Sequence, residues 1–173
     1  MQLNEVNKTL NKFGKYVVSQ ARANLTRGKK NYTRNLYESI TYILEESKIG
    51  PRIYFEMDDY GMFQDQGVKG KNPSLVKNGK QKAPNSKFSF KNKMPPQKPL
   101  SEWAKSKSIR LRDSKGQFKK GNYRTIGFWL QKRIFAQGIK PSLFFTKPFA
   151  KSFKNLPPEL GNSFGIDIEK ILS

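Results

Sequence analysis

The stretch that decides the fold runs from residue 36 to residue 58 and reads LYESITYILEESKIGPRIYFEMD. Its first part, Leu36–Glu46, is rich in residues that favour β-strands, and a turn around Gly50-Pro51 follows it. After the turn, apolar residues recur at every second position from Ile53 to Met57. A period of two places one face of a strand on a core and the other face in water. The stretch therefore predicts an antiparallel β-hairpin.

Helices are expected on both sides of this hairpin. Apolar residues three and four positions apart predict one helix over 3–25 and another over 123–137, with Gly138 as a candidate C-cap. The chain also predicts short helices at 60–67, 99–106, 148–153 and 157–172, a tight turn at 113–116 and a strand at 142–146. This order is typical of an α+β protein, with one domain over residues 1–173 in which a long N-terminal helix and an antiparallel hairpin sheet pack together.

Positive charge is concentrated in one part of the chain. The 173 residues include 34 Lys and Arg against 13 Asp and Glu, a formal net charge of +21. Residues 68–124 hold 17 of the basic residues against two acidic ones, together with five of the ten prolines. This basic excursion is expected to contain a long irregular arm at about 69–93. The candidate partner-binding residues of the arm are Lys69, Lys71, Lys77, Lys80, Lys82, Lys87, Phe88, Phe90, Lys91 and Lys93.

Several classes of protein are disfavoured by the composition. The chain has no Cys and no His, which excludes thiolate zinc sites, cysteine nucleophiles and Ser-His-Asp hydrolysis. A non-enzymatic role without a cofactor is therefore expected. No apolar run approaches the length of a membrane span, and the polar N-terminus lacks the apolar region of a signal peptide. We expect a soluble protein, made in the cytoplasm, with no membrane partner.

Acidic residues gather after the hairpin, and they form a candidate site of negative charge. The members of this patch are Glu56, Asp58, Asp59 and Asp65. Paired acids can bind Mg²⁺ for nuclease chemistry, but no Lys is evident at an adjoining strand position. The favoured interpretation is a solvated hairpin face, and a docking site for the basic arm of a neighbouring subunit is the other hypothesis. The candidates for the core or a subunit interface are Phe144, Phe145, Phe149 and Phe153.

Four stretches, taken in order, resemble one protein family. The first joins ARANL at 21–25 to TRNLYESI at 33–40, and the second is YGMFQDQGV at 60–68. The third is the Pro95-Pro96 pair followed by LSEWAKSKS at 100–108, and the last is GIKP to PFAKSF within 138–153. Together they resemble the tail-completion, neck or minor tail proteins of tailed double-stranded DNA phages. The chain departs from the family pattern in two places, because no Pro follows Asn24 and Arg34 replaces a Gly.

The resemblance implies a homo-oligomeric ring in the neck or tail of the virion, placed on a portal or adaptor protein around the DNA path. It implies no catalytic residues, and the arm at 69–93 has no counterpart in the family pattern. The expected location is the virion, with assembly in the host cytoplasm. The alternative is a basic nucleic-acid-binding module of the packaging-associated or ribosomal type, and an enzyme ranks third.

Three roles for the arm stay open. It could clamp an acidic surface on a neighbouring subunit or the portal, grip DNA phosphates, or remain solvated without a partner. Clamping is favoured over DNA contact, because strong phosphate binding in the lumen of a ring would oppose the sliding of DNA. No recognised DNA-binding motif is present.

Overall fold

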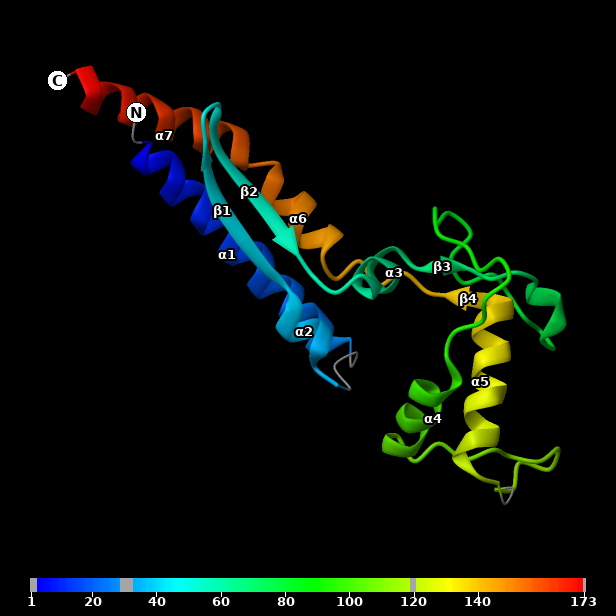
Figure 1. Cartoon of the computed structure of the whole chain (residues 1–173). Helices are drawn as coiled ribbons and strands as arrows, with labels where there is room; N and C mark the ends of the chain where they lie inside the picture. Colours follow the sequence, from blue (N-terminus) through cyan, green and yellow to red (C-terminus); the bar gives the residue numbers. More distant parts are fainter. Residues whose placement is uncertain (1–2, 29–32, 119–120, 173) are drawn as a thin grey trace. The chain divides into compact units, whose positions relative to one another are not determined.

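The protein has an α+β fold with a long N-terminal helix (Figure 1). The computed structural model describes residues 3–28, 33–118 and 121–172. Where the sequence predicts one domain, the chain falls into two compact units. Unit 1 is Met1–Gly61 with Leu143–Ser173, and unit 2 is Met62–Ser142. The basic excursion at 68–124 therefore belongs to a unit of its own, together with the helix that follows it.

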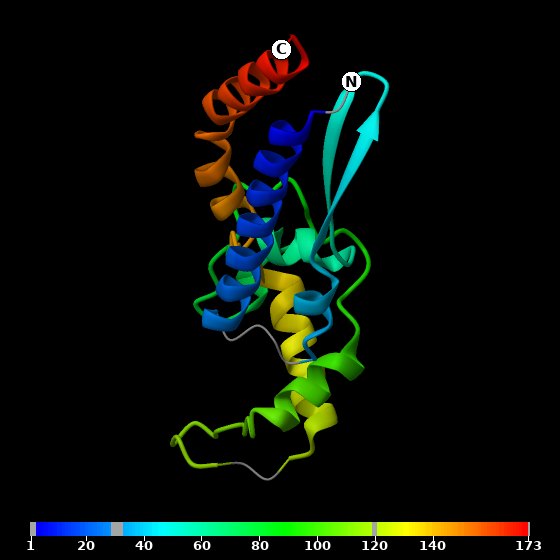
Figure 2. The ribbon, with the colours of Figure 1, turned by 90° about the vertical axis from the view of Figure 1, so that its left-hand side faces the viewer.

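Unit 1 is built on the long helix α1. Its elements are α1 (Asn4–Arg27), α2 (Asn35–Ser39), β1 (Thr41–Ser47), β2 (Gly50–Glu56), α6 (Thr146–Phe153) and α7 (Leu156–Leu172). Helix α1 lies between the β1–β2 hairpin on one side and α6 and α7 on the other (Figure 2). The helix predicted over 3–25 and the antiparallel hairpin are both confirmed. The predicted turn around Gly50-Pro51 is wrong, because both residues belong to β2 and the chain turns at 48–49.

The core of unit 1 lies where the inner face of the hairpin meets α1 and α6. The hairpin pairs Tyr42 with Phe55 and Leu44 with Ile53, so these four side chains share the face that packs on the helices. Phe13 of α1 contacts the Phe55 ring edge-on at a centroid distance of 5.9 Å. Burial of these large apolar groups is the main stabilisation of the unit.

Two further predictions about local structure in unit 1 are wrong. Residues 36–39 belong to helix α2 and not to the strand, because Arg34 adopts a left-handed φ of 61° and starts a new turn that buries Leu36. The predicted strand at 142–146 is a bend. Leu143 has a φ of 51°, which turns Phe144 into the core just before α6 begins at Thr146.

Unit 2 joins short strands to a pair of helices. Its elements are β3 (Val68–Lys69), the 3₁₀-helix η1 (Pro73–Leu75), α4 (Gln97–Ser106), α5 (Tyr123–Gln137) and β4 (Gly138–Ile139), while α3 (Tyr60–Gln66) leads into it from unit 1. Strand β3 pairs with β4 in an antiparallel register, and α4 packs along α5. The bounds predicted for α5 are confirmed, and Gly138 ends that helix with a φ of 86°.

Candidate functional site

The two units differ greatly in charge. Unit 2 holds 20 Lys and Arg against three Asp and Glu, a net charge of +17, whereas unit 1 holds 14 against 10, a net charge of +4. One of the three acids of unit 2, Asp65, is fully buried. Glu102 and Asp113 are exposed, and neither forms an ion pair with a described Lys or Arg. The surface of unit 2 is therefore positive almost without neutralisation.

The segment 69–93, predicted as an irregular arm, has little regular structure but is hydrogen-bonded to the rest of unit 2. The side chain of Gln81 binds both backbone groups of Gly70: its Oε1 accepts the N–H at 2.7 Å and its Nε2 donates to the C=O at 3.0 Å. The N–H of Lys82 donates to the C=O of Gln137 at 2.9 Å, which ties the segment to the end of α5. These contacts fold the segment back onto its own unit.

The far end of this segment pairs with β3. The N–H of Lys69 donates to the C=O of Phe88 at 2.8 Å, and the N–H of Phe90 donates to the C=O of Lys69 at 2.9 Å. The Phe88 ring packs edge-on against the Phe63 ring at a centroid distance of 4.8 Å, and the rings of Phe90 and Phe135 lie 5.8 Å apart between centroids. Both rings are therefore used within unit 2, while most of the segment's lysine side chains are exposed.

The four acids predicted as a docking patch do not come together as one exposed surface. Asp65 is fully buried in α3, and it cannot offer its carboxylate to a neighbouring chain. Glu56 and Asp59 are exposed, while Asp58 is half-buried beside Tyr60. Burial, followed by the charge of Asp58, raises the pKa of the Tyr60 phenol. Within the described residues, no group of His, Cys, Asp or Glu could hold a metal ion.

The outer face of α5 carries cations stacked on aromatic rings. Phe128 and Trp129 are exposed, and each has a cation four residues later in the sequence. Lys132 Nζ lies 4.5 Å from the Phe128 ring centroid, and Arg133 Cζ lies 5.0 Å from the Trp129 ring centroid. This pattern was not predicted, although the aromatic-to-cation spacing of four on the predicted helix at 123–137 was a signal for it.

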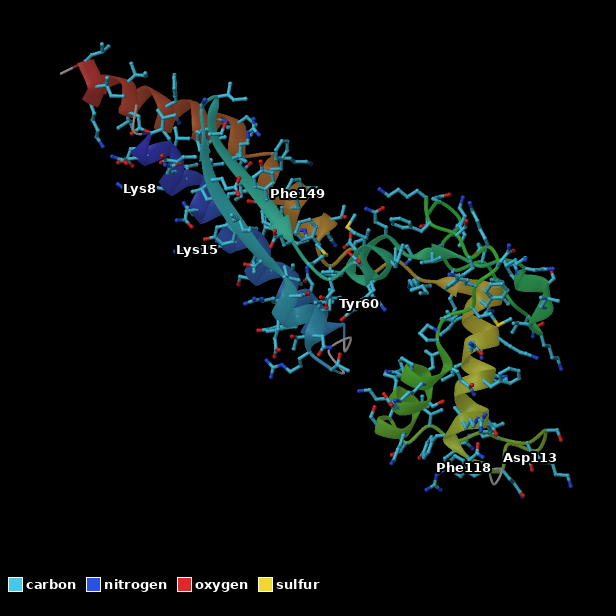
Figure 3. The ribbon with its side chains drawn as sticks, viewed as in Figure 1. Lys8, Lys15, Tyr60, Asp113, Phe118 and Phe149 are labelled. Carbon is cyan, nitrogen blue, oxygen red and sulfur yellow. The ribbon has the colours of Figure 1, made fainter. Side chains whose placement is uncertain are left out.

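A second stacked cluster lies in the loop between α4 and α5, where Figure 3 labels Asp113 and Phe118. Arg112 Cζ lies 4.3 Å and Arg110 Cζ 5.6 Å from the centroid of the exposed Phe118 ring. The Asp113 carboxylate accepts the N–H of Lys115 at 2.9 Å, which closes the tight turn predicted at 113–116. The ring of Phe118 thus contacts two arginines on an exposed loop.

Unit 1 contains a cavity of about 700 Å³, and unit 2 contains one of about 320 Å³. The first is an open groove along α1 that includes Lys15, Arg22 and Arg27. Arg22 already uses one of its hydrogen-bond donors, because its Nη2 donates to the C=O of Ile40 at 2.9 Å. The second cavity lies at the start of α5 and is lined by Ile109, Arg110, Leu111, Phe118, Gly121, Tyr123 and Ile126.

The four aromatic residues predicted as core or interface divide between these roles. Phe144 is buried in the core of unit 1, and Phe145 and Phe149 are half-buried against it. Phe153 is 51% exposed and stacks on Phe149 at 5.6 Å, with an interplanar angle of 12°. Phe153 is therefore the member of the set that can contact another molecule.

Comparison with protein-family models, with curated proteins and with solved structures finds no match to this chain. In the part of the chain that the structure describes, no helix has the length and apolar character needed to cross a membrane.

Proposed function

We propose that the chain is a structural virion protein that forms a homo-oligomeric ring in the neck or tail of a tailed phage. The ring joins a portal or adaptor protein to the tail around the DNA channel, and it performs no catalysis. The sequence resemblance to tail-completion and neck proteins supports this assignment. The observation that carries it is the amount of apolar surface on unit 1 that the chain itself does not cover.

The outer face of the hairpin is the first such surface. Ile43 and Tyr54 lie opposite each other across the two strands, and both are exposed. Ile49 at the hairpin tip is 85% exposed. Among the described residues the sheet contains β1 and β2 alone, so the outer edge of each strand is open to a strand of another copy. Open apolar edges of this kind favour pairing between chains.

Helix α7 is the second such surface. Phe164, Ile166 and Ile171 are each between 44% and 49% exposed along this helix. Scattered exposed apolar residues are common on monomers, but exposed apolar side chains on α7 together with an open, apolar hairpin on the other side of α1 are typical of surfaces that partners cover. A ring buries such surfaces in every copy, because each subunit contacts two neighbours.

A nucleic-acid-binding module is the second candidate function. The net charge of +17 on unit 2 favours it, since a protein ring held together by apolar contacts has no need of such a charge. The two functions are compatible in one molecule, because unit 1 carries the apolar surface and unit 2 the charge.

Native mass spectrometry and negative-stain imaging of the purified protein, with and without a portal protein, test the proposal. Wild-type protein is expected to form rings of one defined subunit number. Tyr54→Lys places a charge on the outer hairpin face and is expected to yield monomers. Tyr16→Lys is the matched control, since Tyr16 is an exposed tyrosine of α1 outside the hairpin. Wild-type protein that stays monomeric in every mixture would overturn the ring, and tight binding of short DNA by that monomer would support the second candidate.

A further inference from the structure

We propose that unit 2 binds the phosphate backbone of a nucleic acid through the outer face of α5 and the loop at 109–118, and not through the lysine-rich segment at 69–93. This proposal is independent of ring formation, because the residues that carry it all belong to unit 2.

The first argument is the layout of the cations. Arg124, Lys132 and Arg133 are exposed on one helix, whose side chains at 125, 128 and 129 are exposed between them. Eight residues of helix separate Arg124 from Lys132, a rise of about 12 Å, and these two cations lie on the same side of α5, whereas Arg133 lies further around the helix beside Trp129. A single nucleic-acid strand carries about four phosphates over that length. The distance between the cations therefore matches a short run of phosphates along a nucleic-acid strand.

The second argument is that the aromatic rings hold the cations in place. Arg112 and Arg110 share the ring of Phe118, and Arg133 lies over Trp129. A guanidinium stacked on a ring keeps its N–H edge available, and its planar fork suits the two oxygens of a phosphate. Arg112 Nη1 donates to the C=O of Gly116 at 2.7 Å, which fixes the group further and uses one of its five N–H donors. Pre-ordered cations lose less entropy on binding than free lysine side chains.

The third argument is the absence of neutralisation. The ion pairs formed among the described residues, through Glu5 and Glu38, all lie in unit 1. In unit 2 the two exposed acids, Glu102 and Asp113, form no ion pair with a described Lys or Arg, so the cations of α5 and of the loop at 109–118 are not neutralised by described ion pairs.

The fourth argument favours nucleic acid over an acidic protein. The cavity of about 320 Å³ at the start of α5 is lined by the rings of Phe118 and Tyr123 beside Arg110. The start of a helix is its positive end, and Asn122 caps α5 by accepting the N–H of Thr125 at 2.8 Å. A nucleic acid supplies both phosphates for the cations and flat bases for the rings, whereas a carboxylate surface supplies charge alone.

The lysine-rich segment serves as the control region. Lys77 and Lys80 are exposed and lie on no described aromatic ring, so their side chains are not pre-ordered. Arg110→Gln with Arg112→Gln and Lys77→Gln with Lys80→Gln each remove two positive charges from unit 2. A purely electrostatic surface would respond equally to both pairs, whereas the proposed face responds mainly to the first.

The experiment measures fluorescence anisotropy of labelled DNA with full-length protein over about 50 to 200 mM salt. A single strand of about 20 nucleotides and the corresponding duplex are the probes, and polyglutamate of equal charge is the competitor. The arginine double variant is expected to bind about tenfold or more weakly, and the slope of log K against log salt on duplex falls by about 2. The lysine double variant is expected to change affinity less than about threefold. The two DNA arms show whether paired or unpaired nucleic acid is preferred.

A third variant, Phe118→Leu, keeps every charge and removes the ring that orders both arginines. It is expected to weaken binding with little change in the salt slope, while circular dichroism shows an unchanged fold because Phe118 is 59% exposed. Equal loss in the two double variants, displacement of DNA by polyglutamate as effective as by unlabelled DNA, or no binding near 50 mM salt would each overturn the proposal. The Tyr54→Lys monomer is expected to bind DNA as wild type does per copy, so failure of the ring and failure of this face are distinguishable.

Discussion

The carboxylate of Asp167 in α7 accepts the backbone N–H of Glu5 at the start of α1 through both oxygens, at 3.0 and 2.9 Å. The N–H of Val6 donates to the same carboxylate at 3.0 Å. Residue Leu3, at the N-cap position of α1, makes no capping side-chain hydrogen bond. The long N-terminal helix is therefore capped by a residue that lies 162 positions away in the sequence.

Replacement of Asp167 is expected to destabilise unit 1. Asp167→Ala leaves N–H groups of α1 without acceptors in a buried place and removes a negative charge from the positive end of the helix. We expect a loss of about 1–3 kcal/mol in the free energy of unfolding by urea. Glu169→Ala is the matched control on the exposed side of α7, with an expected change within about 0.5 kcal/mol. Equal changes in the two variants would contradict the capping role.

The ion pair at the same helix end predicts a pH dependence. Lys170 first, then Lys8, lowers the pKa of Glu5 below its ordinary value of 4.5, and Glu5 raises the pKa of Lys170. A carboxyl whose pKa is lower in the folded state stabilises the fold above its unfolded pKa, and that stabilisation is lost as pH falls through the folded pKa. Wild-type protein is therefore expected to exceed Glu5→Gln in stability near neutral pH, and the difference should shrink in strong acid.

Urea unfolding of both proteins across the acidic range measures this difference. The effect is expected to be small and to weaken with added salt, because Lys8 and Lys170 are exposed to solvent and Glu5 is only half-buried, so the charges are screened. Glu169→Gln removes the same charge on α7 from a residue with no described ion pair, and it should show no such pH dependence. A wild-type advantage that persists unchanged in acid would exclude the Glu5 pair as its source.

Regular apolar spacing allowed the main elements to be predicted from the sequence. Helices α1 and α5 and the β1–β2 hairpin follow a period of three to four or of two, because each buries one face. Residues 36–39 and 142–146 were predicted as strands for their apolar and aromatic content. Their backbone is instead decided by tertiary burial of Leu36 and Phe144, which local propensity does not contain.

The candidate site was predicted in part. The basic character of 68–124 was visible in the sequence, but its density of lysines led to the prediction that 69–93 is the partner-binding segment. The stacked pairs on α5 and at Phe118 depend on distances between side chains and on which helix face α4 covers. The burial of Asp65 could not be predicted from the sequence either, since an acidic residue beside other acids is typical of a solvated surface.

The two hydrogen bonds between the Gln81 side chain and the Gly70 backbone are expected to hold the segment at 69–93 in place. Gln81→Ala removes both hydrogen bonds to the Gly70 backbone, so amide exchange of Lys82 and Phe90 should become about tenfold faster. Gln117→Ala is the control, because its side chain is exposed in the loop before α5. Hydrogen exchange followed by mass spectrometry measures the segment at 69–93 and the loop before α5 separately. Unchanged protection in Gln81→Ala would mean that the strand-like contacts to Lys69 suffice.

Two glycines of unit 2 have a positive φ, but their surroundings differ. Gly138 has a φ of 86° with a ψ of −173°, a combination that glycine alone adopts readily, and Gly116 has a φ of 80°. Alanine at either position therefore carries backbone strain of about 1–3 kcal/mol. A Cβ at Gly116 meets no atom within 4 Å, whereas a Cβ at Gly138 meets the Val68 C=O and lies 2.6 Å from the Gly70 nitrogen.

Gly138→Ala therefore has to open the pairing of β3 with β4 as well as strain the backbone. We expect it to lower the free energy of unfolding of unit 2 clearly more than Gly116→Ala, because Gly138 lies in the β3–β4 pair. Urea unfolding monitored by tryptophan fluorescence reports on unit 2, because Trp103 and Trp129 both lie in it. Equal losses in the two variants would mean that neither the close approach of β3 to Gly138 nor its extended ψ adds to the cost of a positive φ.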